Sequence, residues 1–497
     1  MNKETFKVKT QRAAIIGAGV GGLATAVRLA RRGFEVTVYE QNQYAGGKVS
    51  PITQDGFFWG FGASLFTYPE LLDDVFTTCG RLPSDYYHYQ RLDPVCRYFY
   101  ADGTRLDAFA EPERFAEEIQ NKTGEPREHI LQHLKKIAAV FETTKDVFLF
   151  QSLHKWRTYA SMNTMRSMLR LGSIGIMSNM HRVNEKTFRD QRVVQLFDRY
   201  ASYNGSDPYL APSTLNVIAH LEYNMGAYFL NGGMPDLTAS LYKLALEMGV
   251  RFEFGAAVDG ITVRDGKACA VTVSGTERSA DVVVSNMDVV YTYRKLMPAQ
   301  PAPERSLGQE RSTSAIVFYW GMKAEFPELD MHNIFFAENY AAEFDHLTNK
   351  KMVGDDPTTY VFISSKKQKA HAPAGCENWF VLINAPHDAG QDWDKVVADT
   401  RRQVIAKLSK QLGRDIEPLI VSETVNHPAS IQSKTQSYLG ALYGSSSNDI
   451  FSAFLRHPNF STQIKDLYFC GGSVHPGGGV PLCLLSAKII DELIAEI

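Results

Sequence analysis

Three glycines near the start of the chain have the spacing that a nucleotide phosphate needs. Gly17, Gly19 and Gly22 follow a short apolar stretch and open the segment GLATAVRLARR, whose apolar residues recur at helical spacing. In such a strand–turn–helix the first glycine permits the tight turn, the second lets the backbone approach a pyrophosphate, and the third lets helix and strand pack closely. The unpaired N–H groups and the dipole at the helix start attract the anion. The pattern predicts a dinucleotide site.

Glu40 and Lys48 extend this predicted site beyond a second strand. Glu40 ends the segment FEVTVYE about 20 residues after the glycines, where a carboxylate can accept hydrogen bonds from the adenosine ribose and repel a 2′-phosphate. A second glycine pair, Gly46 and Gly47, leads to Lys48, which we place near the phosphates or the ribityl chain; a solvated lysine after a turn is the alternative. An NAD domain has no need of this extension, whereas a deeply placed flavin needs further backbone along its ribityl chain. The extension therefore favours FAD.

A second glycine-dense turn lies close to the C-terminus. The segment GGSVHPGGGVPLCLLSAKII begins at Gly471, follows the strand-like DLYFC and leads into a helical pattern. Gly472 and Gly479 permit close backbone approach, and Pro481 suits the first turn of a helix. A helix start at this place would stabilise the negative charge of a reduced flavin. We therefore expect both ends of the chain to meet at one cofactor.

The elements that must join these ends lie in the middle of the chain. Residues 228–296 begin with a Gly-Gly turn and continue with an amphipathic helix from about Asp236 to Met248. Alternating strands follow, with hairpin signals at DGK and SGT. We expect this segment to return to the nucleotide site; an ordinary helix-and-hairpin insertion is the alternative.

Length, charge and cysteine usage limit the class of protein. A chain of 497 residues suggests two or three globular units, and a net charge of −3 argues against a nucleic-acid partner. The six cysteines are scattered without a CxxC pair, which predicts a reducing compartment and no metal site. The opening MNKETFKVKTQR lacks the apolar core of a secretory signal, and no run of about 18 uncharged apolar residues occurs. We expect a cytoplasmic protein without a spanning helix.

Taken together, these motifs resemble the bacterial carotenoid (phytoene-type) desaturases of the FAD-dependent amine oxidase superfamily, over essentially the whole chain. Further similar segments are DGFFWGFGASLFTYPELLDDVF (55–76), YNGSDPYLAPSTLNVIAHLEYNMGAYFLNGGM (203–234) and SYLGALYG (437–444). Within that family, the pairing of YNGSDPY with GGSVHPGGGVPLCLLSAK is most similar to the 1-hydroxycarotenoid 3,4-desaturases.

The resemblance implies an α/β fold with a discontinuous domain structure. A Rossmann-type FAD-binding domain would comprise residues 1–105, 225–297 and 430–497. Residues 106–224 and 298–429 would form an inserted α+β substrate-binding domain with a membrane-facing helical region.

The resemblance also implies which residues contact FAD. Val258 would offer its backbone to the adenine, and Asn286 would lie near the cofactor. Gly60 and Ala63 stand where the family usually has Asp and Pro, so flavin contacts there would come from the backbone or from the residues that follow. The complete set of predicted FAD-binding residues is Gly17, Gly19, Gly22, Glu40, Lys48, Ser64, Leu65, Val258, Asn286, Leu442, Gly472, Gly479, Val480, Pro481, Leu482 and Cys483.

The activity implied by the resemblance is desaturation of an acyclic or monocyclic carotenoid, with hydride transfer from a saturated C–C bond to the flavin. Aromatic clusters such as YYHYQ and FYWGM would line a tunnel for the polyene, although each by itself is more typical of ordinary core. No acid–base pair is evident from spacing, so the catalytic residues are unknown. His220 and Glu222, in IAHLEY, are the first candidates for proton removal or for holding a substrate hydroxyl, and a structural pair is the alternative.

A basic segment, residues 151–186, predicts contact with a membrane. Its basic residues include Arg166 and Arg170, its only acid is Glu185, and Trp156 and several methionines interleave with them. A basic amphipathic helix of this composition suits an anionic membrane surface, here the inner face; a helical lid packed on the protein is the alternative.

Other functions remain open from sequence alone. A phytoene desaturase, or a polyene saturase or isomerase, would use the same cofactor contacts. A flavin-free prenyl-lipid carrier belongs to another class, and the intact glycine set with Glu40 and Lys48 argues against it. The substrate bond and the electron acceptor, oxygen or a quinone, are not decided by these residues.

Overall fold

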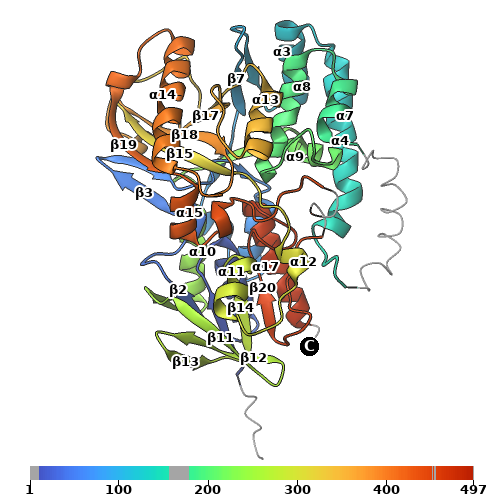
Figure 1. The fold of residues 1–497 in the computed structure, drawn as a ribbon, viewed down its shortest axis with the longest axis vertical. Helices are drawn as coiled ribbons and strands as arrows, with labels where there is room; N and C mark the ends of the chain where they lie inside the picture. Colours follow the sequence, from blue (N-terminus) through green and yellow to red (C-terminus); the bar gives the residue numbers. More distant parts are fainter. Residues whose placement is uncertain (1–9, 156–177, 450–451, 453–454, 496–497) are drawn as a thin grey trace, which may run out of the picture.

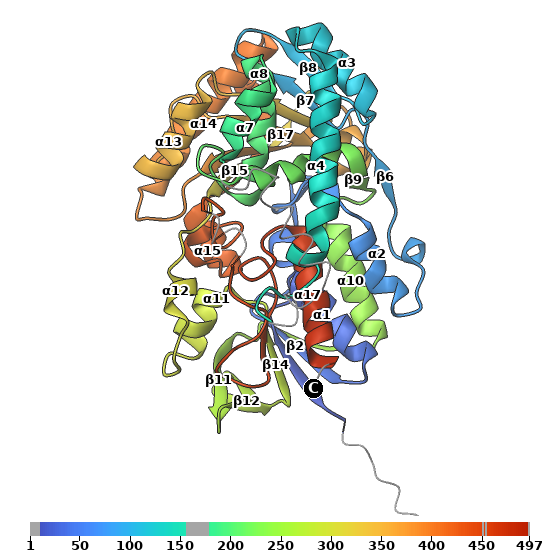
Figure 2. The same cartoon turned by 90° about the vertical axis from the view of Figure 1, so that its right-hand side faces the viewer.

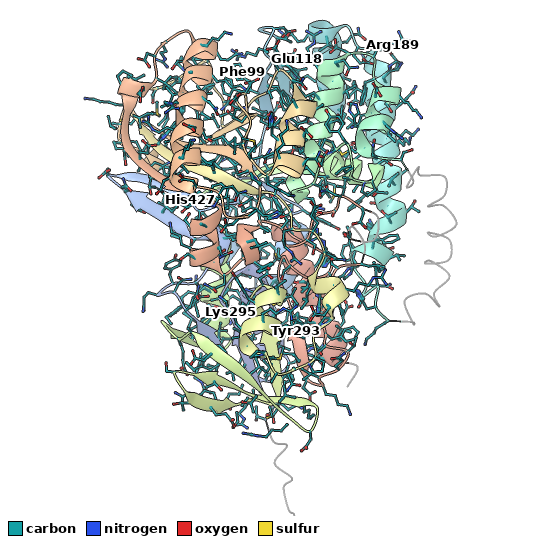
Figure 3. The ribbon with its side chains drawn as sticks, in the orientation of Figure 1. Phe99, Glu118, Arg189, Tyr293, Lys295 and His427 are labelled. Atoms are coloured by element: carbon teal, nitrogen blue, oxygen red, sulfur yellow. The ribbon has the colours of Figure 1, made fainter. Side chains whose placement is uncertain are left out.

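The computed structural model describes residues 10–155, 178–449, 452 and 455–495. Two sheets of different kinds organise the chain: a five-stranded sheet (the first sheet) in the lower half of Figure 1 and a seven-stranded sheet (the second sheet) in the upper half. Among the side chains labelled in Figure 3, Tyr293 and Lys295 belong to the lower half, and Phe99 and Glu118 to the upper half.

The first sheet is parallel and joins segments from the start, middle and end of the chain. Its strand order is β10–β2–β1–β14–β20. The strands are β1 (Arg12–Ile16), β2 (Glu35–Glu40), β10 (Arg251–Phe254), β14 (Val282–Ser285) and β20 (Leu467–Phe469). Because both faces of a parallel sheet are covered, its central strands are apolar throughout, as in the fully buried VVVS of β14. Because its strands are parallel, this sheet places the two predicted glycine turns at the carboxyl ends of its strands, on the same side of the sheet.

Helices cover one face of the first sheet and a small antiparallel sheet covers the other. On the helical face, α1 packs against both α10 and α17. These helices are α1 (Val20–Arg31), α10 (Pro235–Glu247) and α17 (Val480–Ala495). On the opposite face lie β11 (Val258–Arg264), β12 (Lys267–Val273) and β13 (Thr276–Ser279). Residues of β11 and β12 share a buried core with β14 and β20, whereas β13 pairs with β12 and is exposed. The hairpins at DGK and SGT occur where the sequence predicts them.

The second sheet is mixed, with the order β19–β15–β18–β17–β16–β7–β8. Its strands are β7 (Cys96–Phe99), β8 (Arg105–Ala108), β15 (Ser314–Met322), β16 (His332–Phe335), β17 (Thr359–Ile363), β18 (Glu377–Ala385) and β19 (Ile420–Asn426). All pairs are antiparallel except β7 with β16. Strand β7 therefore belongs to the second sheet, although the sequence grouped residues 1–105 with the FAD-binding segment; the pairing with β16 is long-range, and local pattern does not reveal it.

Helices cover both faces of the second sheet (Figures 1 and 2). One face packs on a helical group, α3 (Pro112–Thr123), α4 (Arg127–Phe148), α7 (Met180–Thr187), α8 (Gln191–Asp198) and α9 (Val217–His220), and the other on α14 (Trp393–Leu412). Shorter elements are β3 (Pro51–Gln54) with β4 (Phe57–Gly60), β5 (Phe66–Thr67), β6 (Tyr89–Arg91), β9 (Ala227–Leu230), α2 (Glu70–Thr77), α11 (Val289–Tyr291), α12 (Glu304–Leu307), α13 (Tyr340–Asp345) and α15 (Pro428–Thr435).

The predicted membrane segment is only partly represented. Residues 156–177, which include Trp156, Arg166 and Arg170, lie outside the described residues. Within the described part of the chain, no helix combines the length and the apolar character that crossing a bilayer requires.

Candidate functional site

The N-terminal glycine turn (residues 17–22) has the tight geometry that its spacing predicts. Gly17 has a positive φ of 94°, and its N–H donates to the Tyr39 carbonyl at 2.8 Å. A Cβ on Gly22 would lie only 2.1 Å from the Gly17 carbonyl oxygen, so α1 can approach β1 this closely only with glycine there. Helix α1 then begins at Val20, with its first N–H groups at the edge of the sheet.

A cavity of about 320 Å³ lies in front of this helix start and continues to the second sheet. Its nucleotide side is formed by the N-terminal turn, the end of β2, the Gly46–Val49 turn and the C-terminal glycine turn (residues 471–479). Its other side is formed by β15, β18 and α15, and by Phe61, Leu442 and Tyr443. The apolar side chains on this far side are Ala315, Val317, Tyr319, Phe380 and Leu382.

Glu40 lies at the nucleotide side of the cavity and is buried. Its Oε2 accepts from the Ala18 N–H at 2.8 Å, and its Oε1 accepts from the backbone and side-chain N–H groups of Asn42 at 2.9 and 2.8 Å. A carboxylate has about four acceptor positions, so Glu40 retains capacity for a ribose hydroxyl. The bonds to Ala18 and Asn42 fix its orientation.

Two lysines bring positive charge to the cavity. The Lys48 ammonium donates to the carbonyl oxygens of Leu442 at 2.8 Å and Ala441 at 3.3 Å, and burial lowers its pKa while nearby Asp288 opposes that shift. Lys434, on α15, donates to Asn426 Oδ1 at 2.7 Å. Burial lowers the pKa of Lys434 as well, and no carboxylate among the described residues pairs with it. Both ammonium groups are available to an anionic ligand.

Asn286 joins the two glycine turns. Its backbone N–H donates to the Ile16 carbonyl at 2.8 Å, directly after β14. A Cβ on Gly19, Gly21 or Gly471 would lie 2.7–2.8 Å from the amide group of Asn286, so all three glycines pack directly against this side chain. Both ends of the chain therefore meet at one residue from the middle.

The C-terminal glycine turn leads into α17 in the way that its sequence predicts. The Gly471 N–H donates to Ser486 Oγ at 2.9 Å, which ties the start of the turn to the helix. Gly479 has a φ of 109°, and α17 begins at Val480. Helix α17 thus directs its first turn toward the cavity beside the first turn of α1.

Most of the predicted FAD-binding residues line this cavity, and five do not. Those that line it are Gly17, Gly19, Glu40, Lys48, Val258, Asn286, Leu442, Gly472, Gly479, Val480 and Cys483. Gly22, Ser64, Leu65, Pro481 and Leu482 are absent from its lining. Gly22 acts in packing α1 on β1, as described above. Ser64 bonds to Tyr360 at 2.8 Å, and Leu65 packs against the core between the second sheet and its helices.

His220 and Glu222 do not line the cavity, and each has partners that account for its burial. His220 Nδ1 lies 2.9 Å from Asn224 Nδ2, its ring packs on Phe141, and burial lowers its pKa. Glu222 accepts from Arg199 Nη2 and the Tyr200 hydroxyl at 2.9 Å each, and from the Tyr203 hydroxyl at 3.0 Å. The geometry gives neither residue a position from which to remove a substrate proton from this cavity.

Sequence reasoning missed the contribution of β18 and α15, and from β15 it named only the aromatic cluster FYWGM, of which Tyr319 lines the cavity. On β15, Val317 and Tyr319 face the cavity, and on β18 so do Phe380 and Leu382. Their i, i+2 spacing is the signal that a half-buried strand gives. This alternation is not visible in the sequence of β15, because both faces of the strand are buried and apolar residues therefore occur on both.

The residues at the cavity fit an FAD molecule. Gly19 and Gly21 line the cavity without a side chain that could cover the N–H groups of a helix start suited to a pyrophosphate. Lys48 and Lys434 supply positive charge, and Glu40 suits a ribose. The far side is aromatic and aliphatic, as a flavin ring beside an apolar substrate requires.

Comparison with known proteins agrees with this site. The sequence model of the family described as flavin containing amine oxidoreductase matches residues 20–490. The 1-hydroxycarotenoid 3,4-desaturase of Flavobacterium sp. (strain P99-3) is 45% identical over 484 residues, which cover 97% of this chain and 99% of that protein. The 4,4′-diapolycopene oxygenase of Methylomonas sp. is 33% identical, covering 98% and 99%.

A solved structure shows the same fold. An oxidoreductase from Methanosarcina mazei superposes with a TM-score of 0.63 at 15% identity, over 97% of this chain and all of that one. The sequence-based prediction of an FAD enzyme is confirmed by the family. This chain belongs to the flavin-containing amine oxidoreductases, and within them to the group of the carotenoid desaturases that its motifs resemble.

Proposed function

We propose that the protein is an FAD-dependent carotenoid desaturase that forms the 3,4 double bond of an acyclic or monocyclic carotenoid bearing a hydroxyl at C1. The observation that carries this proposal is the shape of the cavity. One continuous cavity extends from the glycine-lined nucleotide site to the apolar face of the second sheet. The relative that shares 45% of its residues with this chain bears that activity in its name.

The chain's own residues contribute placement and exclusion of water. Bound FAD supplies a hydride acceptor for a C–H bond of the substrate. Val317, Phe380, Leu382 and Leu442 form an apolar wall that suits an extended polyene and keeps water from the reacting bond. Desaturation also releases a proton, and the described acids of the cavity are Glu40 and Asp288.

Both of these acids are engaged by backbone N–H groups. Glu40 bonds to Ala18 and Asn42, as described above. Asp288 Oδ1 accepts from the Val290 N–H at 3.0 Å, and its Oδ2 accepts from the Tyr438 N–H at 3.3 Å. These bonds stabilise structure, so we assign proton uptake to water and not to a carboxylate of the cavity.

We propose different roles for the two sheets. We assign the first sheet to a Rossmann-type FAD-binding unit built from the segments near residues 1–105, 225–297 and 430–497. The second sheet and its helices would hold the carotenoid, using residues 106–224 and 298–429 together with β7. The glycine turns at the edge of the first sheet support this division.

We also propose peripheral association with the inner face of the cytoplasmic membrane, because a carotenoid must leave the lipid to enter the cavity. The basic composition of residues 151–186 supports this proposal. Anionic vesicles should co-sediment with the protein, and neutral vesicles should do so less. If changing Arg166 and Arg170 together to Glu leaves co-sedimentation unaltered, this segment takes no part in membrane binding.

Incubation with a small panel of acyclic carotenoids, with and without a C1 hydroxyl, tests the function. We expect a red shift of the absorption spectrum and loss of two hydrogens per step by mass spectrometry. Products that gain oxygen would instead place this chain with the oxygenase named above. A purified protein without flavin and without affinity for FAD would favour a lipid carrier. Supplying a quinone under nitrogen, or oxygen alone, identifies the electron acceptor.

A further inference from the structure

Three polar side chains form a short series of hydrogen bonds in the core behind the cavity. Ser64 Oγ lies 2.8 Å from the Tyr360 hydroxyl, and that hydroxyl lies 2.6 Å from His332 Nδ1. Ser64 comes from the loop before β5, Tyr360 from β17 and His332 from β16. We call these three residues the serine–tyrosine–histidine chain.

This chain is adjacent to the residues that line the cavity. Tyr360 is the cross-strand partner of Leu382, and its ring centroid lies 6.3 Å from that of Phe380 in a near-perpendicular arrangement. Leu382 and Phe380 both line the cavity, as does Ala63, which immediately precedes Ser64. Directly opposite residues on one face of a sheet are in contact, so Tyr360 continues the wall of the cavity by one strand.

The packing around Tyr360 indicates that the space continues in that direction. Leu65, Tyr203, Ile218 and Tyr360 pack against the core between the second sheet and its helices, yet each is only partly buried. A side chain inside a core is accessible only where the packing leaves room. Ala63 and Leu382 line the cavity and adjoin Ser64 and Tyr360, so the accessible surface of these two residues is next to the cavity.

The neighbouring polar network has no such open end. Arg199 donates to Tyr98, Tyr200, Tyr203 and Glu222, and both oxygens of Glu222 are engaged. This network satisfies its own charges, as a buried ion pair must. Its hydrogen-bonding groups are therefore already used within the network and are not available to a ligand.

The serine–tyrosine–histidine chain, by contrast, has unused capacity. Ser64 is partly exposed, and its hydroxyl has one hydrogen-bond partner within the described structure, Tyr360. His332 Nε2 is buried and has no hydrogen-bond partner among the described residues. Because nothing fixes the histidine tautomer from that side, the three groups can donate in either direction along the chain. The Ser64–Tyr360 end can thus meet a hydroxyl either as donor or as acceptor.

We propose that Tyr360 and Ser64, oriented by His332, bind the hydroxyl group of a polyene substrate and select it over the unhydroxylated counterpart. This inference rests on the proposed function and names the group that the substrate must carry. A hydroxyl inside an apolar cavity costs free energy unless it is paired, and a site built to pair it rejects the analogue that lacks it. In a 1-hydroxy substrate that reacts at C3 and C4, the hydroxyl lies close to the reacting bond. Accordingly, Ser64 adjoins Ala63 of the cofactor cavity.

The test compares two substrates on the FAD-loaded enzyme: an acyclic carotenoid with a tertiary C1 hydroxyl and the same carotenoid without it. We measure kcat/KM for each carotenoid and take the ratio of the two values. We also measure the dissociation constant of each carotenoid, from the change in its absorption band when no turnover occurs, and take the ratio of these two constants. Tyr360→Phe removes the hydroxyl and keeps the ring, and Ser64→Ala is a second variant in case the first fails to fold. Tyr100→Phe is the matched control, because it removes a buried hydroxyl bonded to the Arg192 carbonyl, away from the cavity.

With both ratios taken as hydroxylated over unhydroxylated carotenoid, we expect the kcat/KM ratio to fall and the ratio of dissociation constants to rise, each about tenfold, in Tyr360→Phe and in Ser64→Ala; both should stay at the wild-type value in Tyr100→Phe. Unchanged ratios in the two test variants, or an equal change in the control, would overturn the proposal. If the wild type converts neither carotenoid, the proposed function fails. The ratio of dissociation constants still decides the binding site on its own.

Discussion

Replacing Gly22 with alanine tests whether the N-terminal turn positions helix α1 for the nucleotide. An alanine Cβ at this position would lie 2.1 Å from the Gly17 carbonyl oxygen, whereas ordinary contacts begin near 3.4 Å. The helix must therefore move away from β1 by more than about 1 Å. The Gly17 carbonyl belongs to the backbone and the backbone also fixes the direction of a Cβ, so no side-chain rotation can relieve the overlap.

Two opposing effects decide how much Gly22→Ala changes the free energy of unfolding. Alanine is favoured over glycine inside a helix by about 1 kcal/mol. Overpacking of a close contact costs about 1–3 kcal/mol, and a backbone clash this short lies at or above the upper end of that range. We expect a net loss of about 2 kcal/mol or more in the free energy of unfolding, and an FAD affinity at least about tenfold weaker, because the N–H groups of the first turn of α1 move with the helix.

The assay is titration of the flavin-free protein with FAD, followed by fluorescence quenching, together with urea unfolding. Gly260→Ala is the matched control, since its Cβ would meet nothing closer than 3.7 Å and its φ is not positive. A Gly22→Ala protein that binds FAD and unfolds as the control does would refute the claim that close helix–strand packing sets this site.

Three further outcomes are expected. Lys434→Met should weaken FAD binding several-fold, and the difference should shrink with added salt, because its ammonium lies in the cavity without a carboxylate partner in the described structure; equal affinities at low salt would contradict this. Burial raises the pKa of Glu343 to about 7, so the native state holds a proton that the unfolded chain has lost above pH 4.5. Unfolding free energies of the wild type should therefore fall by about 3 kcal/mol between pH 4.5 and 7 relative to Glu343→Gln in urea titrations, and parallel curves would disprove it. Glu222→Gln should lower stability by about 3 kcal/mol, because Arg199 is left uncompensated, while the flavin content of the folded fraction stays unchanged; loss of activity at unchanged stability would return Glu222 to the catalytic candidates.

Local pattern was sufficient for the nucleotide side of the site. The turn at residues 17–22 and the acid at Glu40 follow from one strand–turn–helix–strand unit, whose geometry a short stretch of sequence determines. The C-terminal turn follows from the pattern in the same way, but the pattern does not tell which of its residues line the cavity. Gly479, Val480 and Cys483 line the cavity, whereas Pro481 and Leu482 do not, because helical residues one and two positions on turn away from that face.

The substrate side depends on pairings that the sequence does not display. Strand β7 joins β16 across more than two hundred residues, and β15 is buried on both faces, so period alone does not tell which of its residues face the cavity. The closeness of His220 and Glu222 in sequence favours interpreting them as a pair. Residues two apart on a helical turn point in different directions, and here they join separate groups of partners.

The meeting of three glycines at Asn286 has a consequence for how the protein acquires its cofactor in the cell. Gly471 is synthesised more than 400 residues after Gly19 and Gly21, so the N-terminal turn leaves the ribosome well before the C-terminal turn does. A nascent chain that has not yet reached Gly471 therefore presents only part of the FAD site. We expect stable flavin loading only after Gly471 and helix α17 have emerged and packed on Asn286.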